Sequence, residues 1–182
     1  MRYTAIFFIA LLVFNTTYPL DKNSSVEISG DKEITDETFR FTFLLPDDWQ
    51  KTDMKFTSNN DAISYSFERK DKKCAIMLLA FKLTTVKNLE DFIYTMEKDI
   101  SLNIPQRDGD YTASDAETFD GKSAKYKDTQ FLEYIYYFRT KLPDAPFNYI
   151  YMMRFITTGA NFSTDLENQI KKISNSFLPT AK

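Results

Sequence analysis

The sequence contains no histidine, a single cysteine and only 4 glycines among its 182 residues. Without histidine the chain lacks the commonest general base near neutral pH, which excludes nucleophilic catalysis of the Ser–His or Cys–His type. Cys74 alone cannot form an intramolecular disulfide, and the chain has neither a Cys/His zinc motif nor a Gly-rich phosphate loop. We therefore predict no catalytic residues, no cofactor-binding residues and no metal ligands.

The apolar content is high enough for one compact domain. Hydrophobic residues make up 43% of the chain and aromatic residues 16%, so a substantial core is expected rather than disorder. The net charge of −3 gives no indication of a nucleic-acid partner. We predict a single domain over residues 37–179, preceded by a polar linker at residues 26–36.

The N-terminus resembles a secretory signal. Arg2 precedes a run of apolar residues that ends at Phe14, and this run is shorter than the roughly 20 residues that a spanning helix needs. Residues 1–25 are interpreted as a signal peptide and its cleavage region, so the protein is predicted to be exported, either periplasmic or secreted, with no membrane span after cleavage. The alternative is an uncleaved N-terminal segment that tethers the protein to a membrane.

Period-2 patterns of apolar residues predict the strands. They cover residues 39–45, 51–57, 62–69, 74–83, 111–119, 122–129, 130–140 and 148–157. The strands at 74–83, 130–140 and 148–157 are apolar on both faces, which places them centrally in a sheet that is covered on both sides. Residues 103–110 are expected to form a loop, and Asp120-Gly121 is expected to form a hairpin turn.

Two helices are predicted from apolar stripes with helical spacing. The first begins after Asn88 as the N-cap, and the second begins with a capping box at Thr164 and ends before Pro179. The stripes consist of Leu89, Phe92, Ile93, Met96 and Ile100 in the first helix, and of Leu166, Ile170, Ile173 and Phe177 in the second.

The stretch FTFLLPDDW at residues 41–49 resembles the opening of the PsbP-like fold, in which a Phe-rich strand is followed by Pro, a turn residue and Trp. The PsbP proteins of photosystem II, the Ran-binding Mog proteins and bacterial exported proteins of the DcrB type share this fold. The resemblance implies an α+β protein with a largely antiparallel sheet and helices packed against it, an α/β/α sandwich. It also implies that Trp49 packs beneath the turn, but it does not imply a function, because members use one scaffold for different partners.

Carboxylates are the remaining side chains that could bind a cation or act in catalysis. Asp108, Asp110, Asp115, Glu117 and Asp120 lie close together in the sequence, and we interpret them as a solvated acidic loop. Weak cation binding and a carboxylate-dependent hydrolase are the alternatives.

The tyrosines of the last two strands are the candidate partner surface. Tyr134, Tyr136, Tyr149 and Tyr151 are favoured as core residues, yet four buried hydroxyls are difficult to satisfy, so at least two are expected to reach solvent. The predicted function is an exported non-enzymatic accessory or binding protein that contacts a partner protein or an envelope component. A carrier of a small apolar ligand is the alternative.

Overall fold

The computed structural model describes residues 30–52, 57–58, 60–86, 88–141 and 147–180, so the predicted signal region lies outside the described residues. The strands are β1 (Lys32–Asp36), β2 (Phe41–Leu45), β3 (Trp49–Thr52), β4 (Thr57–Ser58), β5 (Ala62–Arg69), β6 (Cys74–Leu83), β7 (Gln106–Asp115), β8 (Phe119–Lys127), β9 (Leu132–Thr140), β10 (Asn148–Thr157) and β11 (Leu178–Pro179). The helices are α1 (Leu89–Lys98), the 3₁₀ turn η1 (Ile100–Leu102) and α2 (Thr164–Ser176).

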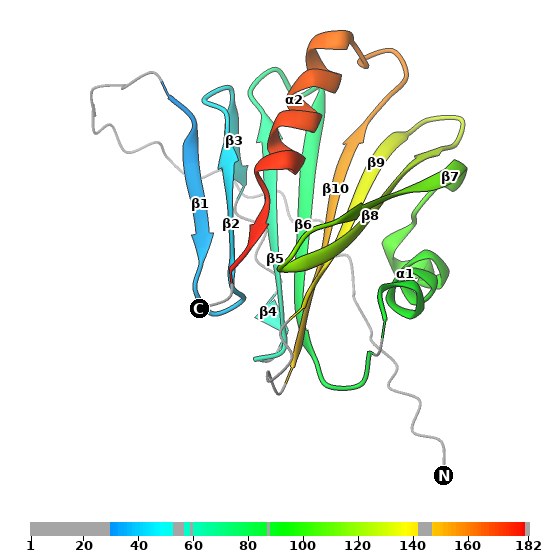
Figure 1. Ribbon diagram of the computed structural model, residues 1–182. Coiled ribbons are helices and arrows are strands. Elements are labelled where there is room, and N and C mark those ends of the chain that lie inside the picture. The colour runs from blue at the N-terminus through cyan, green and yellow to red at the C-terminus, as the bar shows by residue number, and fades with distance from the viewer. Residues whose placement is uncertain (1–29, 53–56, 59, 87, 142–146, 181–182) are drawn as a thin grey trace.

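Two antiparallel sheets form the framework. The large sheet has the order β3-β5-β6-β10-β9-β8-β7, with β4 beside β5, and the small sheet has the order β1-β2-β11. Helix α2 and the small sheet cover one face of the large sheet, whereas α1 packs on its other face (Figure 1). The protein is therefore an α+β sandwich with a largely antiparallel sheet, as the sequence predicts.

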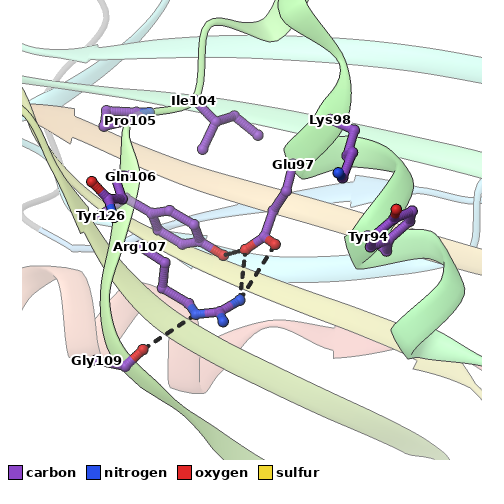
Figure 2. Close-up of a pocket in the computed structure, with 9 residues that line it drawn as sticks. All are labelled: Tyr94, Glu97, Lys98, Ile104, Pro105, Gln106, Arg107, Gly109 and Tyr126. Atoms are coloured by element: carbon purple, nitrogen blue, oxygen red, sulfur yellow. Dashed lines mark hydrogen bonds and ion pairs between the residues drawn. The ribbon is translucent and has the colours of Figure 1, made fainter.

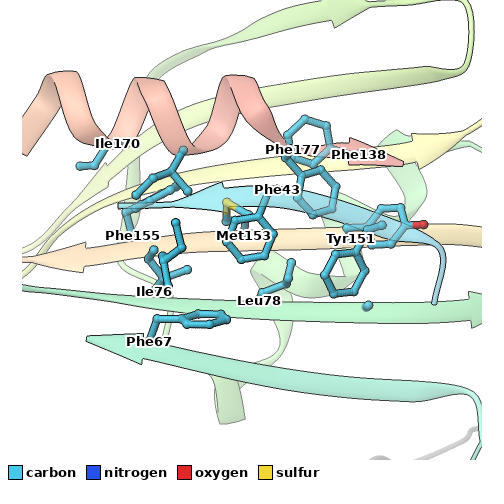
Figure 3. Packing of buried hydrophobic residues seen from close by; sticks show 14 of the residues in the cluster. Phe43, Phe67, Ile76, Leu78, Phe138, Tyr151, Met153, Phe155, Ile170 and Phe177 are labelled. Atoms are coloured by element: carbon cyan, nitrogen blue, oxygen red, sulfur yellow. The ribbon is translucent and has the colours of Figure 1, made fainter. Parts of the chain in front are cut away.

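The main core lies between the large sheet, α2 and β2. Phe177, which follows α2, is surrounded by aromatic rings: Phe41 of β2 stacks on it, and Phe43 of β2 is tilted against it. Phe138 of β9 also stacks on Phe177, with ring centroids 4.7 Å apart (Figure 3). The predicted stripe of α2 is buried in this core. Because burial of large aromatic side chains dominates core energetics, this cluster is the principal stabilising contact between the two sheets.

A second, smaller core lies beneath α1. Leu89, Phe92 and Ile93 pack against the opposite face of the large sheet, where they meet Ile135 of β9 and Ile150 of β10. Strands β9 and β10 thus contribute to both cores, and β6 is sandwiched in the same way. The prediction that these three strands are central is confirmed.

The predicted polar linker at the N-terminus contains a strand in the structure. Residues 32–36, expected to be part of a polar linker at 26–36, form β1 and pair with β2. Ile34 is the single apolar residue of this strand, so no alternating pattern marks it in the sequence. Contacts from distant elements accompany the pairing: the Tyr65 hydroxyl donates to Asp36 at 2.5 Å, and Lys172 forms an ion pair with the preceding Asp31 at 2.6 Å.

The hairpin between β7 and β8 turns earlier than predicted. Asp120 and Gly121 lie inside β8, and the chain reverses at residues 116–118, where the Ala116 N–H donates to the Phe119 carbonyl at 2.9 Å. Gly121 is favoured by close packing rather than by the turn, because a Cβ there would lie 2.4 Å from the Ser114 Oγ and 3.3 Å from the Tyr137 carbonyl and the Phe138 ring. The expected loop at 103–110 is shorter too, since β7 already begins at Gln106.

The helix ends differ from the predictions in detail. Ile100, placed on the apolar stripe of α1 by its spacing, lies beyond the end of the helix in η1 and is 95% exposed. The cap of α2 is Ser163 rather than Thr164, and its side chain accepts from the Leu166 N–H. Strands β3 and β4 occupy part of the strand expected at 51–57, while residues 53–56 lie outside the described residues.

Candidate functional site

Helix α1 is fixed on the sheet by its cap and its apolar face. The Asn88 Oδ1 accepts from the Asp91 N–H at 2.8 Å, acidic residues occupy the first turn and Lys98 occupies the last, an arrangement that suits the helix dipole. The opposite side of the helix faces solvent and carries Tyr94, which is 63% exposed. Ile100 follows the helix and is almost fully exposed.

An apolar groove of about 610 Å³ runs along one side of α1. Its walls come from the end of β6, the connection to α1, the helix itself and η1. The lining residues are Leu79, Phe81, Leu83, Val86, Phe92, Tyr94, Thr95, Met96, Lys98, Asp99 and Leu102. Because α1 covers the sheet only in part, the alternate side chains of β6 remain half-buried at this groove.

A polar hollow of about 670 Å³ lies on the other side of α1, towards β7 and β8. Figure 2 shows its lining residues: Tyr94, Glu97, Lys98, Ile104, Pro105, Gln106, Arg107, Gly109 and Tyr126. Tyr94 and Lys98 line both the polar hollow and the apolar groove, so these two residues stand between them. Together with Ile100, the groove and the hollow form what we call the α1 surface.

The Glu97 carboxylate accepts hydrogen bonds from several residues at the polar hollow. The Glu97 Oε1 accepts from the Tyr111 hydroxyl at 2.5 Å, from the Tyr126 hydroxyl at 2.8 Å and from the Arg107 Nη1 at 3.0 Å. The Tyr126 hydroxyl also lies 3.3 Å from the buried hydroxyl of Tyr137. A chain of hydrogen bonds thus connects the hollow with the core beneath α1.

The phenols of this chain remain protonated donors. Burial is the largest cause that raises the pKa of Tyr126 far above its usual range, and the neighbouring Tyr137 adds to the rise. Burial and the hydrogen bond to Glu97 raise the pKa of Tyr111 as well. The phenols therefore stay neutral at physiological pH, so that Tyr111 and Tyr126 donate to Glu97 and hold it beside Arg107.

The structure separates the four tyrosines of the predicted partner surface into a buried pair and a half-buried pair. Tyr151 is fully buried, and its hydroxyl donates to the carbonyls of Phe39 and Arg40 at 2.8 and 2.9 Å. Tyr149 is also buried, beneath the Arg40 guanidinium. Tyr151 therefore does not belong to a partner surface, because its hydroxyl is bonded to the backbone inside the protein. A contact between Tyr149 and a partner stays a prediction.

Tyr134 and Tyr136 are half-buried on the α2 face of β9. Tyr134 stacks on Phe162 with ring centroids 5.5 Å apart, and Tyr136 meets Phe155 edge-on. A contact between these two residues and a partner stays a prediction.

Three of the five acidic residues that were expected to form an acidic loop are paired with cations. Asp108 contacts Lys127 at 3.1 Å, Asp120 contacts Arg139 at 3.0 Å, and Asp115 pairs with Lys141. Within the described ranges, no group of three or more His, Cys, Asp or Glu side chains is close enough to hold a metal ion. The same part of the chain contains no helix with the length and apolar character needed to cross a membrane.

Sequence reasoning did not identify the α1 surface. Arg107 was placed in a loop, and nothing in the local pattern indicated that it would meet Glu97 of the helix. The available signal was the i, i+4 pair of Tyr94 and Lys98 on the side of α1 away from the apolar stripe.

No protein-family model and no curated protein sequence matches the chain. Among solved structures, the cyanobacterial PsbP (CyanoP) of Synechocystis is similar over 88% of this chain and 98% of its own, with 15% identity and a TM-score of 0.57. The Ran-binding protein Mog1p of Saccharomyces cerevisiae has 10% identity and a TM-score of 0.49, over 83% of this chain and 96% of its own. LpqN of Mycobacterium tuberculosis, described as involved in cell envelope biogenesis, has 10% identity and a TM-score of 0.45, over 83% and 91%. The order of the elements, the helices on both faces of the sheet and this likeness to CyanoP show that the chain has the PsbP-like fold.

Proposed function

We propose that this protein is an exported, non-enzymatic binding protein that contacts a partner protein or another envelope component through its α1 surface. The observation that carries the proposal is the exposure of Ile100 and Tyr94, at 95% and 63%, beside an apolar groove. Apolar side chains that stay in water forgo the stabilisation of about 25 cal/mol per Å² that burial supplies. A contiguous exposed apolar patch is typical of an interaction site, and tyrosine is enriched at such interfaces.

Export is supported by the sequence at the N-terminus. The basic Arg2 and the apolar run up to Phe14 have the form of a secretory signal. Because the described domain begins after this region, its removal would leave both cores and the α1 surface complete.

Site-specific photo-crosslinking in the native host tests the proposal. A photoreactive amino acid at position 94 or 100 is expected to give an adduct with a partner. Matched control positions are Leu44 and Leu178, which are exposed apolar residues of the small sheet on the face opposite α1, at 40% and 48% exposure. Equal adducts at all four positions, or adducts at the control positions alone, would contradict the assignment of the α1 surface.

The apolar groove also favours a second candidate function, the carriage of a small apolar ligand. Its volume of about 610 Å³ lies within the range of roughly 300–1,000 Å³ that is usual for small-molecule sites. Native mass spectrometry of protein purified from its host would detect a retained ligand. Substitution Leu79→Glu, which places a charge in the groove, should abolish that retention.

A further inference from the structure

Helix α1 is a ridge between two hollows that differ in the charged groups they contain. The groove on the β6 side is apolar, the hollow on the β7 and β8 side is polar, and the crest between them is formed by Tyr94 and Lys98. We propose that the two hollows are subsites of one protein-binding surface, and that the partner presents an apolar side chain to the groove and a carboxylate to the polar hollow. This inference rests on the proposed function, and it specifies the chemistry of the partner.

The polar hollow holds a guanidinium in a fixed position. The Arg107 Nε donates to the Gly109 carbonyl at 3.2 Å, its Nη1 donates to Glu97 at 3.0 Å, and the group lies 4.1 Å from the ring centroid of Tyr111. Among the described residues, Nη2 has no hydrogen-bond acceptor. A preorganised guanidinium with a free Nη2 can donate to a carboxylate with little loss of side-chain entropy.

The charge balance of the hollow favours an anion. Its lining contains one carboxylate, Glu97, and two cations, Lys98 and Arg107, which gives a net charge of +1. Glu97 is already engaged by Tyr111, Tyr126 and Arg107. Lys98 has no carboxylate within ion-pair distance in the part of the chain that the structure describes, and its Nζ instead lies 4.9 Å from the Tyr94 ring centroid. An acidic side chain therefore complements the charge of this hollow.

The ridge favours a protein over a single amphiphilic molecule. An α-helix with its side chains is about 10–12 Å wide, and the exposed crest at Tyr94 and Lys98 separates the apolar groove from the cations beyond it. An alkyl chain with an anionic head would have to cross this crest, with part of its length in water. A folded partner instead supplies its two side chains from separate positions on its own surface.

Charge variants of Lys98 test the inference. The readout is the yield of the crosslinked adduct from position 100 in the native host. Lys98→Glu is expected to lower that yield about tenfold, because it removes the cation and adds repulsion against an acidic partner, whereas Lys98→Arg keeps the yield. Lys73→Glu changes the net charge equally on an exposed turn far from α1 and should leave the yield unchanged.

Mass spectrometry of the adduct supplies the second readout. The crosslinked segment of the partner should carry an Asp or Glu next to an apolar side chain. A wild-type adduct that is insensitive to Lys98→Glu, or a segment without an acidic residue, would overturn this inference and leave the proposed function standing. A lipid adduct would assign the surface to an amphiphile instead. The absence of adducts at both position 94 and position 100 would overturn the proposed function and this inference with it.

Discussion

The indole Nε1 of Trp49 donates a hydrogen bond to the Oε1 of Gln169 at 3.0 Å, across 120 residues of sequence. Gln169 in turn donates through its Nε2 to the Oδ2 of Asp48 at 3.0 Å. Trp49 is 1% exposed, so its ring packs in the main core while its only polar atom is satisfied. This contact joins β3 to α2, and it explains why the tryptophan directly follows the Pro-Asp-Asp turn.

Replacement of Trp49 by alanine should lower the free energy of unfolding by about 3–5 kcal/mol, because burial is lost and a cavity remains. Urea denaturation of both proteins measures this difference. Trp49→Phe is the control: it keeps an aromatic ring but removes the donor to Gln169, and it should cost less than Trp49→Ala. An alanine variant with wild-type stability would contradict the structural role.

The hydroxyl of Tyr151 should contribute to stability, because it satisfies two backbone carbonyls at the turn before β2. Tyr151→Phe leaves the Phe39 carbonyl without this donor, whereas the Arg40 carbonyl keeps the Thr180 N–H at 2.8 Å, and the expected cost is about 1–3 kcal/mol. Tyr94→Phe changes an exposed hydroxyl and should stay within about 0.5 kcal/mol of wild type. Equal effects of the two substitutions in chemical denaturation would refute this assignment.

Glu133 and Arg154 form a buried ion pair with two hydrogen bonds of 2.9 Å, and Arg154 also donates to the Leu102 carbonyl at 2.9 Å. Arg154→Met should therefore cost about 3–5 kcal/mol at neutral pH, because it leaves a buried carboxylate without its cation. A double variant with Glu133→Gln should recover part of this loss. If the double variant were less stable than Arg154→Met alone, the unpaired charge would not be the cause.

The cost of Arg154→Met should also depend on pH. Burial, which outweighs the attraction of Arg154, raises the pKa of Glu133 in the folded protein. Because the pKa of Glu133 is higher in the folded than in the unfolded protein, its carboxylate takes up a proton on folding at a pH between the two values. The resulting stabilisation is complete below the unfolded value of about 4.3 and is lost as the pH rises through the folded value. Without Arg154 the folded pKa rises further, so the destabilisation should shrink as the pH falls from 7 towards 5. Thermal melts at several pH values check this, and a pH-independent difference would contradict it.

Gly121→Ala should destabilise the β7–β8–β9 region. The added Cβ would lie 2.4 Å from the Ser114 Oγ and 3.3 Å from both the Phe138 ring and the Tyr137 carbonyl. Rotation of the serine relieves the first clash, so we expect a cost of about 1 kcal/mol, at the low end for overpacking. Ser114→Ala in the same chain should recover part of it, which thermal denaturation can measure. No recovery would place the strain at Phe138 and Tyr137.

The mature N-terminus should lie between about Thr17 and Val26, because the apolar run ends at Phe14 and the first described strand begins at Lys32. Sequencing of the protein from its native host decides this. Recovery of the protein with an intact Met1 in the cytosol would exclude cleavage and export.

The sequence by itself determined which segments are buried on two faces and which on one. The two-sided apolar patterns of β6, β9 and β10 and the stripes of α1 and α2 were predictable because each reflects a local period that burial imposes. Together with the resemblance of residues 41–49 to the PsbP-like fold, these patterns predicted the fold class, and the same resemblance implied the packing of Trp49.

Only the tertiary structure decided the pairings between distant segments. Strand β1 has no apolar period and forms because it can pair with β2. Whether a tyrosine hydroxyl is buried or exposed depends on whether another element places a hydrogen-bond acceptor beside it, as the Phe39 carbonyl does for Tyr151. Likewise, Arg107 meets Glu97 only because β7 returns beneath α1. Hydrophobic periodicity records which side of an element faces the core, but hydrogen bonds and ion pairs between elements depend on their arrangement in space, which no local pattern encodes.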